Sequence, residues 1–123
     1  MTYLIDTHIL IWWLADDPKL PANARVVIVD GSNEILVSSV TIAEIAIKKS
    51  LGTLDMSVTA REALRIGGFD ELPLTADHAA RLETLPWHHR DPFDRMLIAQ
   101  AQHEGHVLVT ADHRFREYDV AVL

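Results

Sequence analysis

The sequence contains no cysteine, which excludes disulfide bonds and zinc sites built on thiolates. No apolar run approaches the roughly 20 residues that span a bilayer, and the first residues lack the basic start and small-residue cleavage site of a signal peptide. Basic residues are a minority, with 11 Lys and Arg against 18 Asp and Glu and a net charge of −7. We therefore expect a cytoplasmic protein without a membrane partner. The acidic balance weakens a nucleic-acid partner without excluding one.

The composition is that of an ordinary globular domain. Hydrophobic residues make up 49% and charged residues 24% of the 123 positions. This length is about the modal size of one domain, so we expect a single domain over residues 1–123.

Short apolar runs alternate with segments of helical periodicity. The runs predict strands at 3–5, 35–37, 107–109 and 120–122, with a further short strand within 69–74. The intervening segments predict helices at 9–14, 22–30, 41–49, 58–66, 76–85 and 91–103. Strands that are apolar on both faces and separated by helices indicate an α/β fold with a parallel sheet covered on both sides. Right-handed crossovers then bring the C-terminal ends of all strands to one edge, where such folds bind ligands.

Several acids follow these predicted strands, and each has a structural interpretation of its own. Asp6 and Asp91 fit helix N-caps. Glu44 fits the last position of a capping box that begins at Thr41. Asp112 fits an ordinary turn.

Taken together, three of the acids fall at one edge of the sheet. Asp6 and Asp112 each follow a buried strand, and Glu44 is expected in the first turn of the helix after the second strand. Periodicity alone does not place Asp94 there. Clustered carboxylates raise one another's pKa unless a cation intervenes, and a site of oxygen ligands favours Mg²⁺ or Mn²⁺. These residues indicate metal-assisted hydrolysis of a phosphate ester.

Four segments, in this order, resemble the PIN-domain ribonucleases, and among them the VapC toxins of toxin–antitoxin pairs. The segments are Tyr3-Leu4-Ile5-Asp6-Thr7-His8, Ser38-Ser39-Val40-Thr41-Ile42-Ala43-Glu44-Ile45, Asp91-Pro92-Phe93-Asp94-Arg95-Met96-Leu97-Ile98-Ala99-Gln100-Ala101 and Val109-Thr110-Ala111-Asp112. The resemblance implies a three-layer α/β/α sandwich with a mainly parallel sheet of four to five strands. It also implies a set of metal ligands and supporting residues: the ligands Asp6, Glu44, Asp94 (rather than Asp91) and Asp112, with Thr110 and Asp91 in support.

The function implied by the resemblance is that of a metal-dependent endoribonuclease toxin. Its cofactor would be Mg²⁺ or Mn²⁺, and its substrate a structured RNA such as tRNA, cut at a single-stranded loop. A cognate VapB-type antitoxin would cover the acids and project an arginine among them. The toxin would form a homodimer, and a heterotetramer or larger assembly with the antitoxin.

Basic and aromatic side chains near the acids are candidate RNA contacts: His88, His89, Arg90, Arg95 and Arg114. The segment 87–90 is more typical of a solvated loop than of an RNA contact, and Arg95 could touch phosphate or pair with a nearby acid. Trp12 and Trp13 are more typical of core or dimer packing than of base stacking.

Residues at single positions argue against two other functions. A haloacid-dehalogenase phosphatase needs an acid two residues after Asp6, where His8 stands. A receiver domain needs paired acids after the first strand and a lysine after a late strand, and neither is present. A DNA nuclease or another non-RNA phosphodiesterase at the same site stays open, as does a binding module whose acids serve only an antitoxin's arginine.

Overall fold

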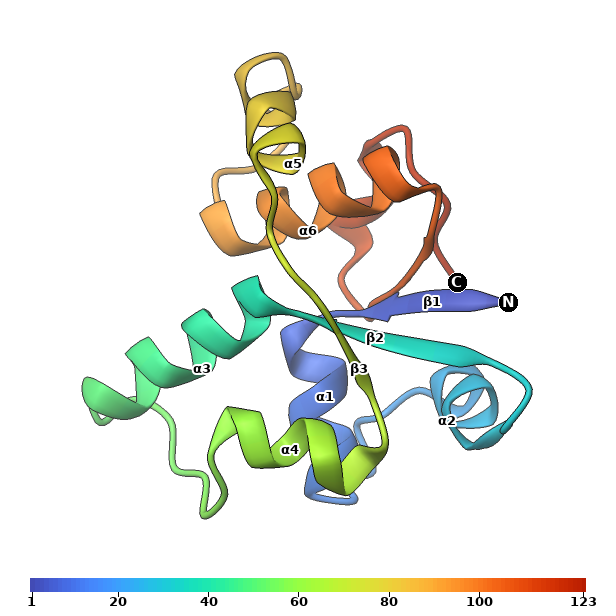
Figure 1. The fold of residues 1–123 in the computed structure, drawn as a ribbon, viewed down its shortest axis with the longest axis vertical. Coiled ribbons are helices and arrows are strands. Elements are labelled where there is room, and N and C mark those ends of the chain that lie inside the picture. Colours follow the sequence, from blue (N-terminus) through green and yellow to red (C-terminus); the bar gives the residue numbers. More distant parts are fainter.

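The computed structural model describes all 123 residues and contains one sheet of four parallel strands, in the order β3-β2-β1-β4 (Figure 1). The strands are β1 (Thr2–Ile5), β2 (Glu34–Ser38), β3 (Asp70–Leu72) and β4 (Val107–Val109). Ile5 at the end of β1 pairs with Val37 of β2 and with Val109 of β4. The neighbouring strands β2, β1 and β4 therefore end at about the same level, and the predicted parallel sheet is confirmed.

Helices cover both faces of this sheet. They are α1 (Thr7–Leu14), α2 (Ala22–Val29), α3 (Ser39–Ser50), α4 (Ala60–Gly67), α5 (Ala76–Ala80) and α6 (Pro92–Glu104), with 3₁₀ turns η1 (Arg81–Glu83) and η2 (His113–Glu117). Figure 1 shows α1, α2 and α4 on one side of the sheet and α5 and α6 on the other, so the expected three-layer sandwich is confirmed. None of the helices combines the length and apolar character needed to cross a bilayer.

Alternation along each strand divides the core into two halves. In β1, Tyr3 and Ile5 pack in the cluster that contains α1, α2 and α4, whereas Leu4 packs with Leu97 of α6 and Phe115 of η2. Burial on both faces explains why the strands read as continuous apolar runs.

Helix α3 begins two residues earlier than the sequence predicts. Ser38 is its N-cap, because the Ser38 side chain accepts a hydrogen bond from the backbone N–H of Val40. Glu44 therefore lies in the second turn of α3, and the expected capping box at residues 41–44 is wrong.

The prediction of a strand at 120–122 is also wrong. Only a single bridge forms there, between Leu108 and Val122. Leu108 donates to the carbonyl of Ala121 and accepts from the N–H of Leu123. Since β4 has three residues, only its central residue presents both backbone groups to that side, and the pairing cannot extend.

Candidate active site

Asp6 lies where β1 ends and α1 begins, at the centre of the sheet edge. Its Oδ1 accepts from the backbone N–H of Ile9 at 2.9 Å and its Oδ2 from the hydroxyl of Thr110 at 2.5 Å. Asp6 therefore caps α1, as one interpretation predicted, while its side chain is buried at the site. Burial raises the pKa of Asp6 above its ordinary value, although both hydrogen bonds favour the charged form.

Thr110 joins Asp6 to Asp112. Its hydroxyl oxygen also accepts from the backbone N–H of Asp112 at 3.0 Å. Asp6 and Asp112 line an open hollow of about 200 Å³ together with His8, Trp12 and Ala111. The two acids that follow β1 and β4 thus face one space, as the shared strand edge predicts.

Glu44 is buried on α3 and is tied to the residue after Asp6. The hydroxyl of Thr7 donates to Glu44 Oε1 at 2.7 Å, and Lys48 Nζ lies 2.6 Å from Oε2. Lys48, one turn further along α3, therefore pairs with an acid of the site.

Asp94 occupies the first turn of α6, whose N-cap is Asp91. The Asp91 carboxylate accepts from the N–H groups of Phe93 and Asp94, which confirms the capping role. Helix α6 ends just before β4 begins, so its first turn lies toward the edge where the strands end. Burial, and then the charges of Asp91 and Asp6, raise the pKa of Asp94 to about 6.

His89 orients the Asp94 carboxylate, and a tyrosine fixes the tautomer of its ring. The Tyr118 oxygen accepts from the backbone N–H of His89 and from Arg95 Nη1, which are groups that can only donate. The phenol proton therefore points to Nδ1 of His89, 2.9 Å away. Nε2 then carries the hydrogen and donates to Asp94 Oδ2 at 3.2 Å. No motif in the sequence marks Tyr118, which lies 29 residues after His89.

The acids lie beyond the ends of parallel strands, and the family of the chain follows from comparison with known proteins. A family model of the PIN domain matches residues 3–121. The chain belongs to the PIN-domain family. Ribonuclease VapC22 of Mycobacterium tuberculosis is 30% identical over 125 residues, which covers 95% of this chain and 92% of that protein.

Solved structures match this PIN domain along its length. The structure of VapBC2 from Rickettsia felis bound to a promoter DNA fragment aligns with a TM-score of 0.74 and 17% identity, covering 100% of this chain and 98% of that one. VapBC-1 from nontypeable Haemophilus influenzae aligns with a TM-score of 0.67 and 20% identity, covering 100% and 97%. The resemblance to VapC-type PIN domains and the fold that it implied are confirmed.

Two of the five candidate RNA contacts are buried in this PIN domain. Arg95 is 3% exposed, and its guanidinium donates to the carbonyls of Leu85 and Pro86 as well as to Tyr118. The expectation that Arg95 contacts RNA is therefore corrected, because its donors are already engaged inside the protein. His89 is also buried and serves Asp94 instead.

The other three candidates are exposed. Arg114 donates to both carboxylate oxygens of Asp112, the shortest contact being 2.6 Å, and lies 4.0 Å from Asp94. These hydrogen bonds lower the pKa of Asp112. His88 and Arg90 lie on the loop before α6 and are open to solvent. RNA contact by these three residues stays a prediction.

The closest grouping of metal-ligand atoms in the molecule lies away from the predicted acids. Ligand atoms of His78, His103 and Glu104 come within 4.8 Å of one another. However, His78 Nδ1 accepts the Thr75 N–H that caps α5, so Nε2 carries the hydrogen and donates to Glu104. A metal-bound histidine donates from its other nitrogen, which this cap prevents. The trio therefore serves to hold α5 on α6. Of the predicted acids, Asp6, Asp112 and Asp94 are linked through Thr110 and Arg114, whereas Glu44 is bonded to Thr7. The four acids do not form such a compact set.

Proposed function

We propose that this PIN domain is a metal-dependent endoribonuclease whose Asp6, Glu44, Asp94 and Asp112 hold Mg²⁺ or Mn²⁺. The observation that carries the proposal is the burial of the Asp6 carboxylate without a cationic partner. Its carboxylate is buried at the sheet edge without a Lys or Arg partner, and the charge of Asp112 raises its pKa further. A buried carboxylate of this kind is stabilised by a cation.

The residues fit a hard divalent ion. All four donor groups are carboxylates, and such ions prefer oxygen ligands while retaining several waters. The hollow of about 200 Å³ beside Asp6 and Asp112 has room for an ion with part of its hydration shell. When bound, the ion would supply positive charge for the phosphate and an activated water as nucleophile.

The residues around the acids orient their carboxylates. Thr110 and the N–H of Ile9 hold Asp6, Thr7 holds Glu44, and His89 holds Asp94. Groups that fix the ligands of a metal in this way limit the reorganisation needed on binding.

RNA as substrate is supported by the likeness to Ribonuclease VapC22, and an antitoxin partner by the VapBC structures. We propose a structured RNA such as tRNA as the target, a VapB-type antitoxin as inhibitor, and a homodimer that assembles with it into a heterotetramer or larger complex. Arg114 bridges toward Asp112 and Asp94, so the acid cluster already accommodates a guanidinium. An antitoxin arginine would use the same chemistry.

The test is cleavage of labelled tRNA and of a single-stranded DNA of matched sequence by the purified protein. We expect RNA cleavage with Mg²⁺ or Mn²⁺, none in excess EDTA, and none of the DNA. Asp6→Asn should retain at most about one hundredth of the rate. Asp55→Asn, at an exposed position, is the charge-matched control. Undiminished cleavage in EDTA would refute the metal mechanism, and cleavage of DNA alone would reassign the substrate.

A further inference from the structure

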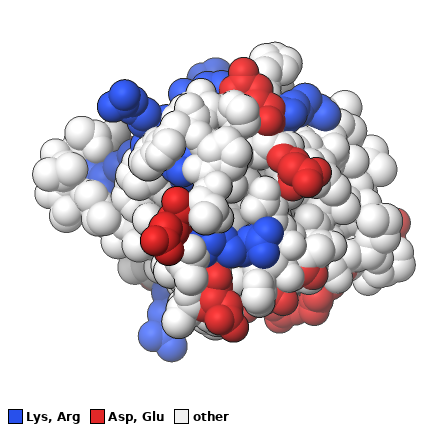
Figure 2. Space-filling view, turned by 90° about the horizontal axis from the view of Figure 1, so that it is seen from above, with Lys and Arg blue, Asp and Glu red and all other residues white.

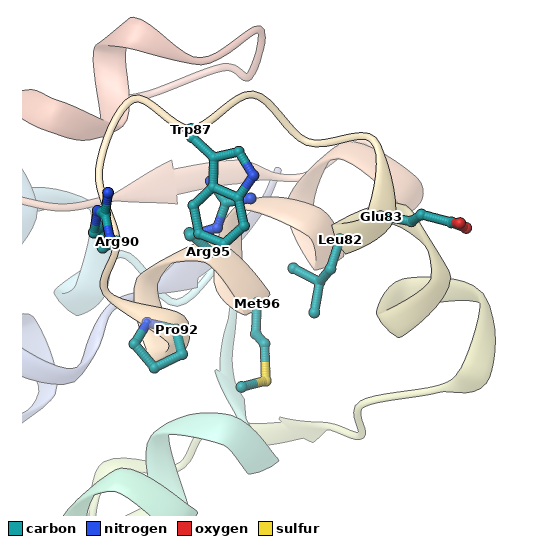
Figure 3. Close-up of a pocket in the computed structure, with 7 residues that line it drawn as sticks. All are labelled: Leu82, Glu83, Trp87, Arg90, Pro92, Arg95 and Met96. Atoms are coloured by element: carbon teal, nitrogen blue, oxygen red, sulfur yellow. The ribbon is translucent and has the colours of Figure 1, made fainter.

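A second hollow, of about 330 Å³, lies between the loop before α6 and the first turns of that helix (Figure 3). We call it the Trp87 pocket, and its lining residues are Leu82, Glu83, Trp87, Arg90, Pro92, Arg95 and Met96. Figure 3 shows the indole ring of Trp87 over the guanidinium of Arg95, with the carboxylate of Glu83 turned away. Its volume is at the lower end of the range for small-molecule pockets.

Trp87 is both exposed and held in place. It is 74% exposed, the largest exposed fraction among the large apolar side chains. The Arg95 guanidinium lies 3.8 Å from the indole centroid, and hydrogen bonds to two carbonyls and to Tyr118 fix that guanidinium. One face of the indole therefore rests on an immobilised cation, while the other face is open to solvent.

Buried side chains link the pocket to the acid site through hydrogen bonds. Arg95, which supports the indole, donates to the same tyrosine that fixes His89, and His89 donates to Asp94. The groups that support Trp87 and Asp94 therefore belong to one hydrogen-bonded network, and Asp94 and Arg95 are consecutive residues of α6.

The charges favour a nucleic-acid occupant. Two arginines line the pocket, and its single acid, Glu83, points away from it. Lys and Arg are interspersed with Asp and Glu on the face seen in Figure 2, so the net charge of −7 does not gather into a continuous acidic surface there. Trp87 is an exposed aromatic ring, and Arg90 beside it is an exposed cation. Unpaired bases stack on such rings, whereas paired bases already stack on one another.

We propose that the Trp87 pocket binds one unpaired nucleobase of the RNA substrate, stacked on the open face of Trp87, with Arg90 at the adjoining phosphate. This inference rests on the proposed ribonuclease function and specifies which part of the substrate the protein grips. It makes Trp87 the side chain that requires the bound RNA segment to be single-stranded.

The test measures binding separately from cleavage. Fluorescence anisotropy in EDTA gives the affinity for a labelled single-stranded RNA decamer, and for decamers with one abasic position moved along the chain. Trp87→Ala should weaken binding of the intact decamer about 5- to 150-fold, while Trp87→Phe, which keeps an aromatic face, should recover much of it. The abasic decamer lacking the stacked base should bind the wild type and Trp87→Ala equally.

The matched control is Val29→Ala, an exposed apolar residue at the end of α2 on the other side of the sheet. It should leave RNA affinity unchanged, and circular dichroism should show each variant folded. If wild-type protein cleaves RNA but Trp87→Ala binds the decamer normally, the base pocket is refuted while the proposed function stands. Loss of affinity for an antitoxin peptide alone would show a peptide site and also refute it. Failure of the wild type to cleave RNA with Mg²⁺ would overturn the proposed function itself.

Discussion

Replacing Asp94 with asparagine should stabilise the metal-free protein at neutral pH while abolishing its response to Mn²⁺. The carboxylate is held at a site where burial and the neighbouring Asp91 disfavour its charged form. Asparagine has nearly the same shape, and its carbonyl can still accept the hydrogen from His89 Nε2. The substitution therefore removes the charge without removing the hydrogen bond.

The magnitude follows from the pKa of Asp94, which rises from 3.8 to about 6 in the folded protein. Below about pH 3 the group is protonated in both states and contributes nothing. Between about pH 3 and pH 7 the unfolded chain loses its proton first, so stability falls as pH rises, and nearly the full loss is present above about pH 7. A difference of about 2 pH units corresponds to about 3 kcal/mol. Because the side chain is 18% exposed and water screens its charge, we expect about 1 to 2 kcal/mol.

Thermal unfolding followed by circular dichroism in EDTA checks this value. At pH 7.5 Asp94→Asn should unfold about 3 to 8 °C above the wild type, and at about pH 3 the two should coincide. Adding Mn²⁺ at 100 times its dissociation constant should stabilise the wild type by about 2.7 kcal/mol and the variant hardly at all. Asp55→Asn should follow the wild type throughout. A variant less stable than the wild type at pH 7.5 in EDTA, or a difference that does not change with pH, would refute the reasoning.

Three further substitutions test the groups around the acids. Thr110→Val removes the hydroxyl that links Asp6 to Asp112 and should weaken Mn²⁺ binding about 10- to 100-fold by calorimetry, with Thr110→Ser restoring most of it. Arg114→Ala removes a cation that competes with the ion, so Mn²⁺ should bind more tightly while RNA binds more weakly; parallel weakening of both would contradict this. Tyr118→Phe should lower the free energy of unfolding by about 1 to 3 kcal/mol in urea, because two buried donors lose their acceptor, and an unchanged midpoint would contradict it.

The sequence predicts the sheet well because its strands are apolar on both faces, a pattern that depends only on burial. The start of α3 is less predictable. Ser38, Ser39 and Thr41 can each cap a helix, and the local pattern favours Thr41. The structure selects Ser38, whose hydroxyl also donates to Gln100 of α6. That contact spans 62 residues and leaves no mark on the local sequence.

Asp6, Glu44 and Asp112 are predictable from their places after strands and Asp94 from the family resemblance, but the partners of these acids are not. Arg95 is a candidate RNA contact in the sequence because it is adjacent to Asp94, where it could touch phosphate or pair with a nearby acid. Its partners are two carbonyls 9 and 10 residues earlier and a tyrosine 23 residues later, so only the fold brings them together. The sequence places His89, five residues before Asp94, in a polar loop as a candidate RNA contact. Its role as a hydrogen-bond donor depends on the tautomer that Tyr118 imposes.

The distribution of positive charge divides the four acids into two pairs. Glu44 has Lys48 at 2.6 Å and Asp112 has Arg114 at 2.6 Å, and both cations reach the site from half-exposed positions. Asp6 and Asp94 have no Lys or Arg within 3.5 Å, and they are the two acids of the site whose pKa is raised. Burial is the first cause of both shifts, and the charges of Asp112 on Asp6 and of Asp91 and Asp6 on Asp94 add to it. A divalent ion held by Asp6 and Asp94 would therefore stabilise the two carboxylates that the fold compensates least, while Lys48 and Arg114 can swing toward solvent or phosphate when it binds.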